Sequence, residues 1–133
     1  MSIIDDLLEA VEREAGEALD APVLEVRVGA FWTAVVVTTA NGPRCGLASA
    51  LPDEAHRYLG RHPVRDAGRL HGRRAGELIA LARSESTLEA SIGLATINAL
   101  LPVDESACVE RNAEEVILER GTDRQVVIVG HFP

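Results

Sequence analysis

Apolar residues recur every three or four positions in four stretches of the chain, a spacing that predicts four helices. The stretches are 3–19, 73–83, 86–101 and 113–120. Ser2 is the expected N-cap of the first helix, and Ser86 followed by Glu89 is typical of a capping box at the start of the third. From Ile92 onward the third helix is apolar nearly all round, so we expect it to lie at the centre of the fold.

Three stretches between the first two helices have the composition of strands. Residues 23–29 alternate apolar and polar side chains, and 31–39 are richer in β-branched residues. Asn41 and Gly42 separate the second stretch from a third at 44–49, and this dipeptide favours a tight hairpin turn. The order of elements predicts an α+β domain, in which a three-stranded antiparallel meander carries its helices on one face.

The connecting segments are marked by proline and glycine. Residues 52–74 predict a long loop with one helical turn at 53–59, and 103–111 have the composition of a linker. Near the end of the chain, 126–129 is a continuous run of Val and Ile that is followed by Gly130. Such a run predicts a buried strand of the parallel type, whose following turn opens a ligand crevice. We therefore expect a linker helix and the first strand of a second domain.

Composition and charge exclude several classes of function. The chain has 133 residues, is 47% hydrophobic and carries a formal net charge of −8. An acidic protein does not displace counterions from nucleic acid and is repelled by an anionic membrane, so neither is an expected partner. The N-terminus lacks the pattern of a signal peptide, and no apolar run reaches the length of a membrane span. We expect a cytoplasmic protein.

Three segments resemble a known family: GLAS at 46–49, STLEASIGLATINALLP at 86–102 and VVIVGHFP at 126–133. Together they are similar to the family described as Putative heavy-metal chelation. The resemblance implies a domain like the N-terminal domain of enolase over 1–111. It also implies that 112–133 are a linker helix and the first strand of a Rossmann-like domain, the rest of which is absent. A ligand pocket between the two domains and a role in metal-chelator metabolism or heavy-metal homeostasis are implied as well, without an established reaction.

Two residues of the third predicted helix are candidate ligand-binding residues. Asn98 is a polar residue on an otherwise apolar helix. Its amide either ties the helix to a neighbouring segment or faces the interdomain pocket, because a buried amide without a partner costs about 1–3 kcal/mol. Gly93 costs about 1 kcal/mol in a helix relative to alanine, which indicates close approach by another backbone or by a ligand.

The start of the same helix and the end of the chain supply the other candidates. Glu89 lies in the first helical turn, where free N–H groups either bind an anion or are simply capped. The turn after the terminal strand contains Gly130, His131, Phe132 and Pro133, which would face the ligand crevice of an intact two-domain protein. The turn does not have the GxGxxG pattern, so the sequence does not predict a dinucleotide cofactor.

Basic residues gather in 56–74, which holds six Arg and three His against a single acid, Asp66. This segment either binds a phosphate or carboxylate, or pairs with the acidic first helix, or is solvated. The histidines lack metal-ligand spacing, and Cys45 and Cys108 are far apart, so the sequence predicts no metal site. A family role in chelation then indicates a chelating small molecule rather than an ion bound by the protein.

The leading hypothesis is a small-molecule-binding domain whose site lies at the junction with a Rossmann-like domain. The alternative is a non-catalytic interaction module that forms a homo-oligomer through its exposed C-terminal strand, because an unpaired strand edge is a template for association. An enzyme acting alone is not indicated, since no nucleophile or acid–base pair has an evident partner.

Overall fold

Helix α1 (Ile3–Ala15) begins at the predicted N-cap. Ser2 Oγ accepts a hydrogen bond from the Asp5 N–H group at 3.3 Å, and the Asp5 carboxylate accepts one from the Ser2 N–H group at 3.2 Å. The reciprocal pair satisfies N–H groups that a helix leaves free at its start. Gly16, with a φ of 49°, ends the helix, and a 3₁₀ turn η1 (Gly16–Asp20) completes the predicted stretch.

The structure is a computed structural model that describes residues 2–50 and 64–127, divided into the compact units Met1–Pro102 and Val103–Pro133. In the first unit, strands β1 (Val23–Val28), β2 (Trp32–Thr39) and β3 (Gly42–Ser49) form an antiparallel sheet in the order β1-β2-β3. The predicted meander is therefore confirmed. Thr39 pairs with Gly42, so the hairpin turn lies at 40–41, one residue earlier than the predicted turn at Asn41 and Gly42.

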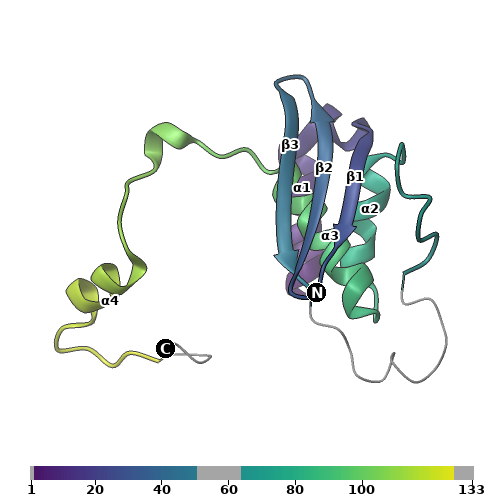
Figure 1. The fold of residues 1–133 in the computed structure, drawn as a ribbon. Coiled ribbons are helices and arrows are strands. Elements are labelled where there is room, and N and C mark those ends of the chain that lie inside the picture. The colour runs from purple at the N-terminus through teal and green to yellow at the C-terminus, as the bar shows by residue number, and fades with distance from the viewer. Residues whose placement is uncertain (1, 51–63, 128–133) are drawn as a thin grey trace. The chain divides into compact units, whose positions relative to one another are not determined.

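The described α-helices of the first unit lie on one face of this sheet, as Figure 1 shows. They are α1, α2 (Ala75–Ile79) with its 3₁₀ continuation η3 (Ala80–Arg83), and α3 (Thr87–Leu100). Val35 and Val37 of β2 are fully buried beneath them, as are Leu8 of α1 and Ile92 of α3. The α+β class with helices on one face is thus confirmed, and the core consists of aliphatic side chains.

Helix α3 lies at the centre because two glycines let its backbone come close to its neighbours. A Cβ at Gly46 of β3 would lie 2.0 Å from the Ala95 carbonyl oxygen of α3. A Cβ at Gly93 would lie 2.2 Å from the backbone nitrogen of Ala82 in η3. Of the two alternatives for Gly93, the structure shows close approach by another backbone. Real Cβ atoms essentially never come this close to other atoms, so α3 packs at this spacing against β3 only with Gly46, and against η3 only with Gly93.

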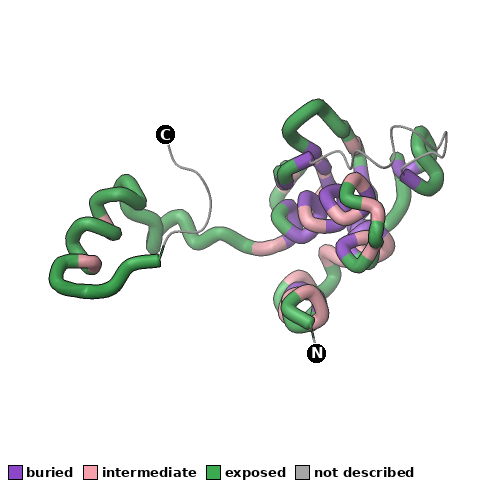
Figure 2. Tube along the Cα trace, turned by 90° about the horizontal axis from the view of Figure 1, so that it is seen from below, coloured by how far each residue is buried: buried purple, intermediate pink, exposed green. Residues whose placement is uncertain are grey.

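The second unit contains the 3₁₀ turn η4 (Glu105–Ala107) and helix α4 (Ala113–Gly121). Asn112 caps α4 by accepting a hydrogen bond from the Glu114 N–H group at 3.0 Å, as the sequence indicates. The described residues of this unit are exposed or half-buried (Figure 2).

Two predicted elements fall wholly or partly outside the described residues. The helical turn at 53–59 lies outside them, and so do residues 128–133 of the predicted terminal strand. Val126 and Val127, which are described, belong to no strand and are exposed. Among the described helices, none has both the length and the apolar composition needed to cross a membrane.

Candidate functional site

The described residues cover the outer edge of β1 over only half of its length. The Val23 N–H group donates to the Arg73 carbonyl at 2.8 Å, and the Gly72 N–H group donates to the Val23 carbonyl at 2.8 Å. His71 Nδ1 lies 2.8 Å from the Leu24 carbonyl oxygen. Because a carbonyl only accepts, this contact requires the proton on Nδ1. The segment before α2 therefore runs along the first half of β1 like a short additional strand.

Beyond Leu24 the strand and this segment separate, and a groove of about 520 Å³ lies between them. The pairing register of β1 with β2 shifts between Val23 and Glu25, so a bulge at Leu24 marks the point of separation. The groove is lined mainly by apolar residues of β1, of 64–71 and of α3. They include Val26, Val28, Val64, Leu70, Leu88 and Ile92, and the polar lining residues are Glu25 and His71.

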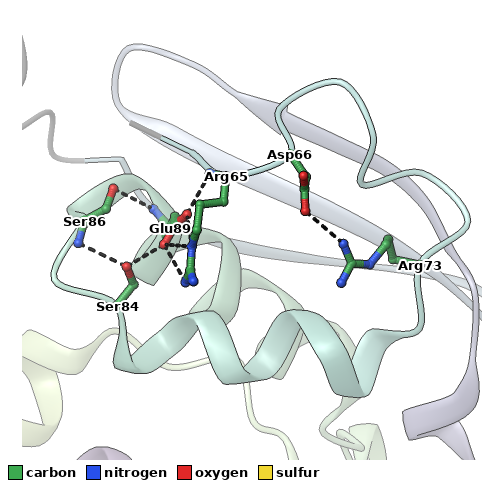
Figure 3. A network of polar contacts seen from close by, with 6 residues as sticks. All are labelled: Arg65, Asp66, Arg73, Ser84, Ser86 and Glu89. Atoms are coloured by element: carbon green, nitrogen blue, oxygen red, sulfur yellow. Dashed lines mark hydrogen bonds and ion pairs between the residues drawn. The ribbon is translucent and has the colours of Figure 1, made fainter. Parts of the chain in front are cut away.

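A buried carboxylate ties the segment that begins at Val64 to the start of α3 (Figure 3). The Glu89 side chain is 4% exposed and accepts hydrogen bonds from the Arg65 N–H group at 2.7 Å and from Arg65 Nε at 3.0 Å. The Ser84 hydroxyl donates to the same carboxylate. Burial raises the pKa of Glu89, but the hydrogen bonds from Arg65 and Ser84 outweigh it and lower that pKa to about 2. The network thus fixes one wall of the groove.

Arg73 and Arg74 of the predicted basic segment are paired with acids, as Arg65 is with Glu89. Arg73 forms ion pairs with Glu77 and with Asp66, the latter at 3.2 Å, and Arg74 forms one with Glu77 at 3.1 Å. Hydrogen bonds from Arg73 and Arg74 lower the pKa of Glu77. The interpretation in which the segment pairs with acids is therefore favoured for these residues. Asp66 and Glu77 lie within or beside the segment, but Arg74 also pairs at 3.4 Å with Asp20, one residue after the predicted first helix.

The structure places the predicted ligand-binding residues of α3 on different sides of the helix. Glu89 faces Arg65 and Ser84, and Gly93 is buried against η3. Asn98 is exposed, and its Nδ2 donates to the Leu47 carbonyl of the edge strand β3 at 2.8 Å. Asn98 is therefore not brought together with Glu89 and Gly93. Residues 130–133 lie outside the described residues, so the ligand-binding role of the whole set stays a prediction.

The residues of α3 that do line the groove are Leu88 and Ile92, one position before Glu89 and Gly93. Sequence reasoning missed them because an apolar residue on an apolar helix carries no sign of whether it faces a core or a cavity. Val26 and Val28 had a clearer signal in the alternation along β1. The sequence places His71 in the basic segment but gives no sign that it lines a groove.

Asn98 offers a direct test of its contact with β3. We expect Asn98→Ala to lower the free energy of unfolding by about 0.5–1.5 kcal/mol, the value of one hydrogen bond. Asn98→Asp should be more destabilising at neutral pH, because a carboxylate would face the Leu47 carbonyl oxygen. Below about pH 4 the new carboxyl group is protonated and donates, so Asn98→Asp should become more stable than Asn98→Ala and approach the unaltered protein. Urea unfolding of the three proteins at neutral pH and below about pH 4 measures these differences. If both variants were as stable as the unaltered protein at neutral pH, the contact between Asn98 and Leu47 would be contradicted.

The fold and groove define an α+β domain with a three-stranded antiparallel sheet and one helical layer. The family model described as Putative heavy-metal chelation matches residues 11–101. The chain belongs to this family. A search of curated proteins found no match.

Two solved structures of proteins of unknown function from the DUF364 family are similar to this chain. One is from Pyrococcus horikoshii, with a TM-score of 0.63 and 26% identity over 84% of this chain and 43% of the other. The second is from Desulfitobacterium hafniense DCB-2, with a TM-score of 0.47 and 24% identity over 88% of this chain and 40% of the other. The chain therefore spans less than half the length of either protein.

Proposed function

We propose that this chain is a small-molecule-binding domain and that the groove beside β1 holds the ligand. The observation that carries the proposal is the groove itself. Its volume of about 520 Å³ falls in the range of ligand pockets, roughly 300–1,000 Å³. Its apolar lining with two polar residues, Glu25 and His71, matches the usual composition of such sites, in which a few polar groups orient the ligand.

An organic chelator or its metal complex suits this groove better than a bare ion. Family membership supports a link to chelation. Over the part of the chain that the structure describes, no group of three or more His, Cys, Asp and Glu side chains is placed to hold a metal ion. At the groove, Glu25 is paired with Arg27, and His71 Nδ1 is engaged by a carbonyl. These residues do not fit a metal centre, so we assign the metal-binding groups to the ligand.

We also propose that a second, Rossmann-like domain supplies the remaining wall of the site. The Pyrococcus horikoshii protein is more than twice as long as the part that matches this chain, which leaves room for such a domain. The run of Val and Ile at 126–129 would be its first strand, and the turn at 130–133 would face the ligand. As part of the same proposal, the first unit corresponds to a domain like the N-terminal domain of enolase.

A charge placed in the groove tests the proposal. Val28 is 43% exposed at the groove, so Val28→Arg should leave the fold intact and obstruct the site. We expect the protein to bind the amphiphilic dye anilinonaphthalene sulfonate saturably, and the variant to bind it at least about tenfold more weakly, a loss of about 1.4 kcal/mol. The measurement is a fluorescence titration, accompanied by native mass spectrometry for any retained organic molecule.

Val103→Arg is the matched control, because Val103 is 65% exposed and lies outside the groove. Both variants make the same change of side chain and charge. Equal dye binding by Val28→Arg and the unaltered protein would show that the groove is not the site. Equal loss in both variants would attribute the effect to added charge alone.

The second candidate function, an interaction module that assembles through its C-terminal strand, has one observation in its favour. Val126 and Val127 are 48% and 79% exposed, which leaves apolar β-branched residues without cover. Removal of 124–133 should then abolish any oligomer while the first unit stays folded. The same truncation serves as a control below.

A further inference from the structure

Within the unit Met1–Pro102, none of the described helices lies on the face of the sheet opposite α1, α2 and α3 (Figure 1). Along β2 every second residue is fully buried toward the helices, and the alternate residues lie on the open face. The pairing register places Leu47 opposite Ala34 and Cys45 opposite Val36. Cross-strand partners share a face, so these four residues form one continuous apolar surface with Trp32.

This open face, defined by Trp32, Ala34, Val36, Cys45 and Leu47, exposes large apolar side chains. Trp32 is 62% exposed and Leu47 is 52% exposed. Phe31, just before β2, is 78% exposed. The chain has only four aromatic residues, and two of them are exposed at this end of the sheet. Contiguous exposed apolar surface of this kind marks an interaction site.

The open face also differs in charge from the rest of the molecule. The chain has a net charge of −8. On β1, the residues opposite Val36 and Ala34 are Glu25 and Arg27, which form an ion pair with each other. One acid and one base on this face cancel, so the open face is neutral. Two copies of an acidic chain repel each other least when they approach through a neutral surface.

We infer that the open face is the interface of a homodimer, in which two sheets pack face to face about a twofold axis. A basic partner would be drawn to the acidic surfaces instead, so the neutral face favours a second copy. In such a dimer each copy contributes the same residues, and the two sheets stack with their apolar side chains between them. The inference goes beyond the proposed ligand-binding function. Val26 and Val28 of the groove lie opposite Val35 and Thr33, on the helical side, so the dimer leaves these apolar lining residues free, whereas Glu25 lies on the open face.

Sedimentation equilibrium of the full chain tests the inference. We expect the unaltered protein to have twice the monomer mass of 14.2 kDa. Leu47→Arg places a charge in the centre of the open face and should raise the dimer dissociation constant by at least about 30-fold. Leu118→Arg is the matched control, because Leu118 is 67% exposed and lies on α4. It should remain a dimer.

The truncation of 124–133 separates this interface from the C-terminal strand. The truncated chain should remain a dimer. A monomeric unaltered protein would overturn the inference, as would a dimer that tolerates Leu47→Arg but is lost on truncation. Trp32 provides a test without substitution, because it is the sole tryptophan and lies on the open face. Its emission should shift to longer wavelength on dilution, and emission that is independent of concentration would also overturn the inference.

Discussion

Replacing Gly93 by alanine is expected to lower the free energy of unfolding by roughly 2–3 kcal/mol, although alanine has a higher helix propensity than glycine. In a helix interior with free space around the glycine, the same change would raise the free energy of unfolding by about 1 kcal/mol. At Gly93 the new Cβ would lie 2.2 Å from the Ala82 backbone nitrogen and 2.7 Å from its Cα. These are backbone atoms of η3, so no side chain can rotate away, and α3 must separate from η3.

Gly76→Ala is the matched control for this prediction. Gly76 also lies in a helix, α2, but there the nearest atom to a new Cβ is the Leu19 carbonyl oxygen at 3.2 Å. We expect this variant to change stability by less than about 1 kcal/mol, because propensity and slight crowding nearly cancel. Urea unfolding of the three proteins measures the difference. If both alanine variants were equally stable, close packing of α3 against η3 would not be a source of stability.

The sequence predicted the close approach at Gly93 because a glycine in an apolar helix is costly and calls for a reason. It did not predict the equivalent role of Gly46, although GLAS was noted as part of the family resemblance. A glycine in a strand that follows a hairpin turn has several ordinary explanations, and only the three-dimensional position of Ala95 identifies the correct one. Local patterns thus predicted the elements, whereas the contact between Gly46 and Ala95 that positions α3 on the sheet joins residues about fifty positions apart.

The same limit applies to the candidate site. The start of α3 was correctly placed at Ser86, which accepts a hydrogen bond from the Glu89 N–H group. The direction of the Glu89 side chain was not predictable, because its partner Arg65 is 24 positions earlier and follows a long segment rich in proline and glycine. The groove could not be predicted either, since it exists only where β1 and the segment after Val64 separate at a bulge.

The carboxylate of Glu89 should make the stability of this protein strongly dependent on pH. Its pKa is lowered from 4.5 to about 2 in the folded state. Well above pH 4.5 the Glu89 carboxyl group is ionised in both the folded and the unfolded state, and the network then contributes about 3 kcal/mol to the free energy of unfolding. As the pH falls from about 5 to about 2, the unfolded state takes up the proton first, and this contribution is lost.

Glu89→Gln should therefore destabilise the protein by about 3 kcal/mol at neutral pH, and the difference from the unaltered protein should narrow as the pH falls toward 2. Glutamine keeps the volume of the side chain but does not attract Arg65 as a carboxylate does. Glu85→Gln, which alters an exposed glutamate near the start of the same helix, controls for the change in net charge. Chemical denaturation of the three proteins across this pH range measures the effect. If the free energies of unfolding of Glu89→Gln and the unaltered protein differed by the same amount at all pH values, ionisation of Glu89 would not hold the segment that begins at Val64 to α3.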